Sequence, residues 1–262
     1  PEIKGITFKN RKIGLGVMGF ADLLILLGIP YNSKKAVEFS KGLMRFIRRE
    51  SLKASVELAR KRGVFPNFKK SIYVRTNLKL RNATVNTVAP AGTISIIAGC
   101  SSGIEPLFAI SFTRNVLSGT KLFEINPIFE RLARERKFYS RSLMLKIART
   151  GSIQGVSGIP ADIKRRFITA FDVTPSQHLY IQAAFQQYTD NSVSKTVNLP
   201  KEAKAEDVKG IYLLAHKLKC KGITIYRYGT KKEQVLSFPQ KAVNFVSAES
   251  EYAGGCASAV CA

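Results

Sequence analysis

The chain has no tryptophan, only two histidines and only four cysteines among its 262 residues. No apolar run approaches the ~20 residues of a membrane-spanning helix, and there is no signal-peptide pattern. The cysteines form no Cys-x-x-Cys pair, and His178 and His216 are isolated in the sequence, which argues against a metal site such as a zinc centre. We therefore expect a soluble, cytoplasmic protein without a bound metal.

Acidic residues are also scarce: 18 Asp and Glu stand against 42 Lys and Arg, which gives a net charge of +24. Such a field attracts polyanions and nucleotides. The basic runs fall on or beside predicted helices, where charged solvated faces are ordinary. Aromatic residues do not cluster with these runs, so the stacking pattern of single-strand binding is not evident. A basic nucleic-acid-binding module is kept as one alternative function.

A glycine motif lies in the stretch RKIGLGVMGFADLL, where Gly14 to Gly19 have the spacing of a dinucleotide-binding fingerprint. That fingerprint requires a buried strand before the first glycine and an acidic residue ~20 positions later at the end of a second strand. Residues 9–13 make a poor core strand, and no acidic residue lies at the required place. We interpret the glycines as the close-packed start of a helix over 17–27. An NAD-dependent oxidoreductase that uses this motif is the second alternative.

The periodicity of the chain predicts an α/β fold. Ser33 can cap a long helix that ends at Gly63, and Asn126-Pro127 and Thr174-Pro175 are typical helix starts. The predicted later helices span about 127–137, 141–149, 175–187 and 205–219, the last with Tyr212 in its buried stripe. Strands are predicted at 192–199 and 222–227, and this strand–helix–strand unit favours a parallel sheet.

A phosphate-binding loop is one interpretation of the stretch NATVNTVAPAGTISIIA at 82–98, which has the pattern of a strand, a turn and a second apolar run. The candidate residues at the predicted strand-to-helix junction are Pro90, Ala91, Gly92, Thr93, Ile94 and Ser95. Backbone N–H groups there can cradle phosphate, Gly92 allows close approach, and two hydroxyl groups can add hydrogen bonds. A plain Pro-Gly turn is the other interpretation of the same residues.

The four cysteines divide into two groups. Cys100 and Cys220 are predicted to pack as small apolar residues. Cys256 and Cys261 lie on a glycine-led terminal stretch that we expect to be flexible. A mobile dithiol can carry out thiol–disulfide exchange, and two incidental thiols are the other interpretation.

Five blocks of the sequence together resemble the large chain of ribonucleotide reductases, in the adenosylcobalamin-dependent class. They are RKIGLGVMGFADLLILLGIPY, RNATVNTVAPAGTISIIAGCSSGIEPLF, QQYTDNSVSKTVNLP, KGITIYRYGTKKEQVL and GGCASAVC, in the family's order. The resemblance implies the C-terminal portion of a ten-stranded α/β barrel that is incomplete on its own. Residues 1–237 would belong to this catalytic barrel, and residues 238–262 would form a flexible tail with a redox cysteine pair.

The resemblance implies reduction of ribonucleotides to 2′-deoxyribonucleotides for DNA synthesis by thiyl-radical chemistry. It implies adenosylcobalamin as the cofactor, a ribonucleoside di- or triphosphate as the substrate and a thioredoxin-like reductant as a partner. It assigns the substrate phosphate to the loop from Pro90 to Ser95. It assigns a dithiol relay to Cys256 and Cys261.

Three departures from the family pattern carry expectations of their own. Ala91 stands where relatives commonly have threonine, so one hydroxyl contact to phosphate would be missing. Arg227 separates Tyr226 from Tyr228, whereas relatives that import a radical carry adjacent tyrosines, and this favours adenosylcobalamin. The Asn-x-Cys-x-Glu pattern of the radical cysteine does not occur. We expect no turnover by this chain alone and activity only with the N-terminal part of the reductase, in cis or in trans.

Overall fold

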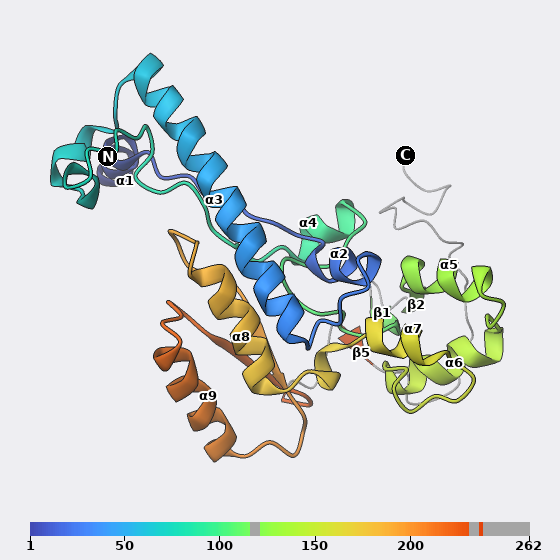
Figure 1. Ribbon diagram of the computed structural model, residues 1–262. Helices are drawn as coiled ribbons and strands as arrows, with labels where there is room; N and C mark the ends of the chain where they lie inside the picture. Colours follow the sequence, from blue (N-terminus) through green and yellow to red (C-terminus); the bar gives the residue numbers. More distant parts are fainter. Residues whose placement is uncertain (116–120, 231–235, 238–262) are drawn as a thin grey trace, which may run out of the picture.

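The computed structural model describes residues 1–115, 121–230 and 236–237 (Figure 1). The α-helices are α1 (Glu2–Asn10), α2 (Phe20–Leu26), α3 (Lys34–Arg62), α4 (Gly92–Ile97), α5 (Pro127–Glu135), α6 (Arg141–Thr150), α7 (Ala161–Arg166), α8 (Pro175–Gln186) and α9 (Ala205–Lys217). Short 3-10 turns are η1 (Pro66–Lys70), η2 (Ile72–Val74) and η4 (Ala170–Asp172). The strands are β1 (Ser111–Asn115), β2 (Lys121–Ile125), β3 (Thr196–Leu199), β4 (Thr224–Arg227) and β5 (Leu236–Ser237).

A row of parallel extended segments organises the fold. Leu15 bridges to Asn86, Val88 bridges to Val193, and β3 pairs with β4 from Thr196↔Thr224 onward, all in parallel. The α/β prediction and the strand–helix–strand unit at the end of the chain are therefore confirmed. The strand predicted at the start of 82–98 is reduced to isolated bridges, and the apolar run that follows it forms α4.

Side-chain amides connect this row where the ladder of backbone hydrogen bonds is irregular. The Asn191 side chain donates to the carbonyl of Asn86 at 3.0 Å, and the Asn86 side chain donates to the carbonyl of Tyr188 at 3.0 Å. The Asp190 carboxylate accepts from the backbone N–H of Val85 at 2.9 Å. These bonds replace missing ladder contacts, because buried backbone groups need partners.

Two long helices cover the row, with α3 packed along α8 (Figure 1). The Ser33 hydroxyl accepts from the backbone N–H of Ala36 at 3.1 Å, as the predicted cap requires. The backbone at Gly63, with φ 76°, ends α3 where the sequence predicts. The core beneath contains Phe20, whose ring centroid lies 5.1 Å from that of Phe185 in an edge-to-face arrangement.

A second group of helices, α5 to α7, packs beside the antiparallel sheet β2-β1-β5 (Figure 1). The Asn126 side chain caps α5 by accepting from the N–H of Phe129 at 3.0 Å, which confirms this predicted helix start. Phe129 is fully buried, and its ring centroid lies 5.1 Å from that of Phe167. The sequence made no prediction for the antiparallel sheet.

Two details of the sequence prediction are wrong. The helix predicted over 17–27 begins only at Phe20, because Gly19 adopts a left-handed conformation with φ 78° at the N-cap. Tyr212 is 53% exposed and does not belong to the buried stripe of α9, whose buried residues are Ile211 and Ala215.

The glycines of the fingerprint serve close packing, although on an extended segment rather than on a helix. A Cβ atom on Gly16 would lie 2.5 Å from the carbonyl oxygen of Thr87, and one on Gly14 would lie 2.4 Å from the Thr87 methyl group. The backbone at Gly16 is thus covered by its neighbour, which leaves no approach for a pyrophosphate. The NAD-binding alternative is not supported.

We predict that Gly16→Ala lowers the free energy of unfolding by about 1–3 kcal/mol, because the new methyl group meets backbone that cannot move aside. Gly42→Ala is the matched control: nothing lies within 4 Å of its Cβ position in α3, so it should stabilise by up to ~1 kcal/mol. Urea denaturation of both variants measures the difference. Equal stabilities for the two variants would contradict the close-packing role of Gly16.

Candidate functional site

The candidate site lies where two parallel segments continue into loops. Residues 13–15 lead into the loop that ends at Gly19, and residues 84–88 lead into the loop before α4. Carboxyl ends of neighbouring parallel strands meet at one edge, which is where α/β folds bind ligands. A third loop joins them, because Gly19 donates to the carbonyl of Ser101 at 2.7 Å and Phe20 donates to that of Gly103 at 3.3 Å.

The loop from Pro90 to Ser95 presents backbone donors to solvent. Ala91 is the N-cap of α4 and makes no side-chain cap, and the first hydrogen bond within α4 runs from the Ser95 N–H to the Ala91 carbonyl at 3.0 Å. The N–H groups of residues 92–94 therefore precede the helical ladder, and these residues are exposed. Apart from its chain neighbours and the backbone of α4, no described atom lies within 4 Å of a Cβ position on Gly92, so the described residues leave the backbone there open to a ligand.

The two hydroxyl groups of this loop differ. Ser95 is buried, and its hydroxyl donates to the carbonyl of Gly92 at 2.9 Å, inside the helix. Thr93 is exposed. Of the two hydroxyls named by the sequence, Thr93 therefore has the better access to a ligand at the loop.

A buried lysine just before β3 contacts the loop after α4. Lys195 is 1% exposed, and its ammonium group donates to Glu105 Oε2 at 2.5 Å, to His178 Nδ1 at 2.8 Å and to the carbonyl of Thr196 at 2.6 Å. Glu105 Oε1 accepts from the N–H of Thr196 at 2.6 Å. All three ammonium hydrogens have acceptors, as a buried charge requires. The network joins the loop after α4, helix α8 and strand β3.

The tautomer of His178 follows from its two partners. Nε2 lies 3.1 Å from the carbonyl of Ala170 and must donate, so Nδ1 is free to accept from Lys195. Burial, and then the charge of Lys195, lower the pKa of His178 from 6.5 to about 3. Burial also lowers the pKa of Lys195, against the opposing effect of Glu105.

Asp22 and Ser101 hold the third loop onto α2. The carboxylate of Asp22 accepts from the N–H of Ser101 at 2.5 Å, and the Ser101 hydroxyl accepts from the N–H of Asp22 at 3.2 Å. Burial raises the pKa of Asp22. Burial, followed by the Asp22 charge, raises the pKa of Cys100, which disfavours the reactive thiolate.

The remaining sequence-predicted residues are placed as follows. Cys220 packs against the apolar cluster around Ile211, which confirms its prediction, and burial raises the pKa of its thiol. Tyr226 and Tyr228 are half-buried on either side of an exposed Arg227, and the Tyr228 ring centroid lies 5.6 Å from that of Phe171. Cys256 and Cys261 lie outside the described residues.

The described residues also bear on metal binding and on membrane insertion. Within residues 1–115, 121–230 and 236–237, no group of three or more His, Cys, Asp or Glu side chains could hold a metal ion. Among the helices that the structure describes, none has the length and apolar character needed to cross a membrane.

Comparison with known proteins identifies relatives over the whole chain. Residues 1–226 match the family model described as ribonucleotide reductase, barrel domain. The chain is 48% identical over 261 residues to the vitamin B12-dependent ribonucleoside-diphosphate reductase of Mycobacterium tuberculosis, covering 100% of this chain and 37% of the relative. It is 51% identical over 236 residues to the Thermoplasma acidophilum protein of the same name, covering 90% of this chain and 31% of the relative.

A solved structure supports the fold. The class Id ribonucleotide reductase alpha subunit of Actinobacillus ureae superposes with a TM-score of 0.73 at 24% identity, covering 86% of this chain and 40% of that chain. The chain thus spans about a third of the length of the two curated relatives above. These relatives give no support to a nucleic-acid-binding module.

The sequence analysis missed the Lys195 network, because its three side chains are separated by up to 90 residues along the chain. One signal was present in the stretch SVSKTVNL: Lys195 lies between Val193 and Val197 on the face that is otherwise apolar. A lysine in a buried strand is almost never found unpaired, so an acidic partner could have been sought.

We predict a measurable contribution of His178 to the acid sensitivity of the fold. Its pKa is about 6.5 in the unfolded chain and about 3 in the fold, so the unfolded state binds one more proton between these values. This share of the stability is complete above pH 6.5 and is lost as the pH falls toward 3, by ~1.4 kcal/mol per pH unit. His178→Asn keeps an acceptor for Lys195 and should reduce the slope by that amount in urea titrations.

The control is His216→Asn on the exposed face of α9, which should keep the wild-type slope. Indistinguishable slopes for His178→Asn and the wild type would show that His178 titrates normally in the fold.

Proposed function

The chain belongs to the ribonucleotide reductase barrel-domain family, and on that premise we propose that it is the C-terminal part of a barrel that reduces ribonucleotides to 2′-deoxyribonucleotides. The supporting observation is the row of parallel segments that ends at an open backbone loop beside Gly92. The enzyme would be a vitamin B12-dependent ribonucleoside-diphosphate reductase, as its relatives in Mycobacterium tuberculosis and Thermoplasma acidophilum are named.

The loop from Pro90 to Ser95 would bind the substrate phosphates. Its support is the set of N–H groups at 92–94 at the start of α4, the open space at Gly92 and the exposed hydroxyl of Thr93. Ala91 is buried and adds no hydroxyl, so backbone donors must supply more of the binding. We propose a ribonucleoside diphosphate as the substrate, following the names of the relatives.

Adenosylcobalamin would supply the radical that starts the reaction. Beside the loop, the exposed isoleucines Ile94, Ile96 and Ile97 are the described residues that could offer such a cofactor an apolar surface. The separation of Tyr226 from Tyr228 supports the proposal, since it interrupts the tyrosine pair of relatives that import a radical.

Cys256 and Cys261 would serve as the dithiol relay. Oxidation of the two thiols to one disulfide releases two electrons and two protons, which reduce the disulfide that each turnover leaves in the active site. A thioredoxin-like dithiol then returns two electrons and two protons to the pair. A cytoplasmic location would keep such a relay reduced.

We predict that the isolated chain forms no deoxynucleotide, and that joining it to the N-terminal part of a close relative restores the activity. The test mixes or fuses the two parts with adenosylcobalamin, a ribonucleoside diphosphate and dithiothreitol, and measures the deoxynucleotide by chromatography. Product from the isolated chain would refute the requirement for a second part. A folded fusion that binds nucleotide and cobalamin but forms no product would refute the proposed function.

The same fusion tests the relay. Cys256→Ser with Cys261→Ser should permit one turnover and then stop when thioredoxin is the reductant, because the active-site disulfide is no longer reduced. Undiminished multiple turnover with thioredoxin would exclude the relay role of this pair.

We predict that Gly92→Val in the fusion raises the KM for the diphosphate by roughly tenfold, about 1.4 kcal/mol, because the side chain enters the space that a phosphate would take. Gly222→Val is the control, since its Cβ position also has nothing within 4 Å and lies before β4. The unfolding midpoint of both variants should stay near that of the parent. An unchanged KM for Gly92→Val would exclude this loop as the phosphate site.

A further inference from the structure

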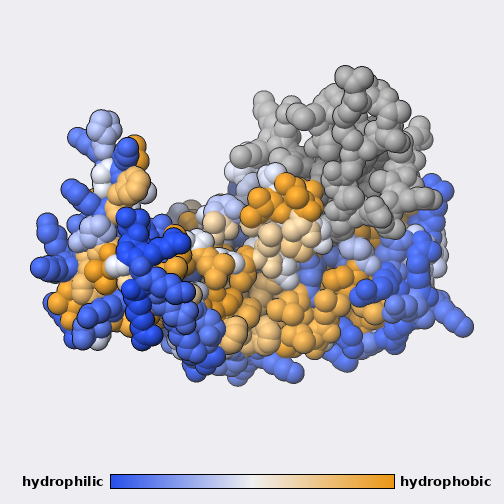
Figure 2. Space-filling model, turned by 90° about the horizontal axis from the view of Figure 1, so that it is seen from above, coloured by the Kyte–Doolittle hydropathy of each residue, from blue (hydrophilic) through white to orange (hydrophobic). Residues whose placement is uncertain are grey.

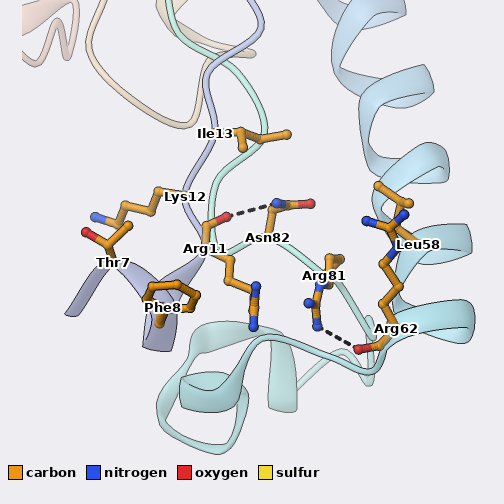
Figure 3. Close-up of a pocket in the computed structure, with 9 residues that line it drawn as sticks. All are labelled: Thr7, Phe8, Arg11, Lys12, Ile13, Leu58, Arg62, Arg81 and Asn82. Atoms are coloured by element: carbon orange, nitrogen blue, oxygen red, sulfur yellow. Dashed lines mark hydrogen bonds between the residues drawn. The ribbon is translucent and has the colours of Figure 1, made fainter. Parts of the chain in front are cut away.

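A basic site, separate from the loop at 90–95, lies at the far end of α3 from the core. A cavity of about 330 Å³ opens between α1, the last turns of α3 and the segment at 81–82 (Figure 3). Four cationic side chains line it: Arg11, Lys12, Arg62 and Arg81. Figure 2 shows hydrophilic side chains gathered at this end of the molecule. The volume is near the lower end of the range of small-molecule sites.

The four cations have no acidic partner among the described residues. Other arginines of the chain do find carboxylates, as Arg134 does with Glu130 at 2.6 Å and Arg136 with Asp162 at 2.5 Å. No described carboxylate lies within 4.0 Å of the four cations around the cavity. Burial, and then the charges of Arg11 and Arg62, lower the pKa of Arg81. Like charges held this close favour the binding of an anion.

Arg11 has a second unusual feature, in its backbone. It adopts the left-handed conformation, φ 48° and ψ 41°, as the C-cap of α1. Glycine or asparagine takes this conformation at lower cost, so an arginine here is disfavoured by local conformation alone. Its guanidinium carbon lies 5.7 Å from the Phe8 ring centroid, and its buried Nε has no hydrogen-bond partner in the described structure. An unpaired donor on a strained residue indicates a role for the side chain.

The cavity also has an ordered frame and an apolar wall. The Arg81 guanidinium donates to the carbonyls of Arg62 at 2.7 Å and Gly63 at 3.1 Å, which fixes it at the end of α3. The Asn82 side chain donates to the carbonyl of Arg11 at 2.9 Å and holds α1 in place (Figure 3). Phe8, Ile13 and Leu58 line the remaining surface.

We propose that this cavity binds a phosphate-bearing small molecule, with the phosphate between the guanidinium groups and an apolar body against the apolar wall. Guanidinium forks match the oxygen geometry of phosphate in two-point hydrogen bonds. The charges of Arg11, Arg62 and Arg81 exceed what a single carboxylate would neutralise, so a doubly charged phosphate suits the cavity better. The site is separate from the loop at 90–95 and does not rest on the proposed reductase function.

The test is calorimetric titration of the whole 262-residue chain at about 150 mM salt, where nonspecific attraction is screened. The probes are pyrophosphate, adenosine diphosphate and acetate. We expect saturable binding of both phosphates and no saturation by acetate. Adenosine diphosphate should bind more tightly than pyrophosphate, because its aromatic base can pack against the apolar wall. Arg11→Asn tolerates the left-handed backbone, so it should weaken phosphate binding by about tenfold or more while the unfolding midpoint is maintained.

Arg60→Gln is the matched control: it removes the same charge from an exposed position on α3 outside the cavity, and should change binding less than twofold. Arg62→Gln gives a second test, because its side chain holds no described hydrogen bond. In the Gly92→Val background, which impairs the separate loop at 90–95, Arg11→Asn should still weaken phosphate binding by about tenfold. The proposal is overturned if wild type shows no saturable binding, if acetate binds equally well, if Arg60→Gln weakens binding as much as Arg11→Asn and Arg62→Gln do, or if Arg11→Asn has no effect in the Gly92→Val background.

Discussion

The ammonium group of Lys195 connects parts of the chain that no regular ladder joins. Its three hydrogen bonds reach the loop at Glu105, helix α8 at His178 and the start of β3 at Thr196. Removing one partner of a buried charge leaves the other without compensation, which is among the most destabilising changes a fold can undergo. The position of the loop after α4 therefore depends on this buried contact, and so does the edge at which the loop at 90–95 opens.

The parallel segments are joined by few backbone hydrogen bonds. Single-residue bridges at Asn86 and Val88 connect the row, and side-chain amides supply the remaining bonds. The relatives are about three times as long, and a barrel distributes its strands over that greater length. The exposed isoleucines of α4, among them Ile97 at 75%, belong to a surface that such a larger protein can cover.

Local signals account for what the sequence predicted correctly. Ser33, Asn126 and Thr174 each cap the helix that follows, and each acts through a hydrogen bond within three residues, so the pattern is readable without tertiary structure. Exposure of Tyr212 was not readable in this way, because the periodicity of α9 is apolar on more than one face.

Most of the features that sequence analysis missed depend on distant residues. The Lys195 network and the basic cavity each bring together side chains from segments far apart, and no spacing rule encodes such a meeting. The left-handed backbone of Arg11 was also invisible, since nothing in the polar opening of the chain distinguishes it from its neighbours. The loop at 90–95 could be singled out from the sequence because its residues are consecutive, and its phosphate-binding role stays a prediction.

Helix α3 has a mechanical consequence. Its 29 residues make a rod about 44 Å long, with Ala36 and Met44 fixed in the core near one end and Arg62 at the cavity near the other. A continuous helix without proline is stiff along its axis. A displacement at the cavity end of α3 would therefore be passed along the helix to the core, where α3 packs along α8.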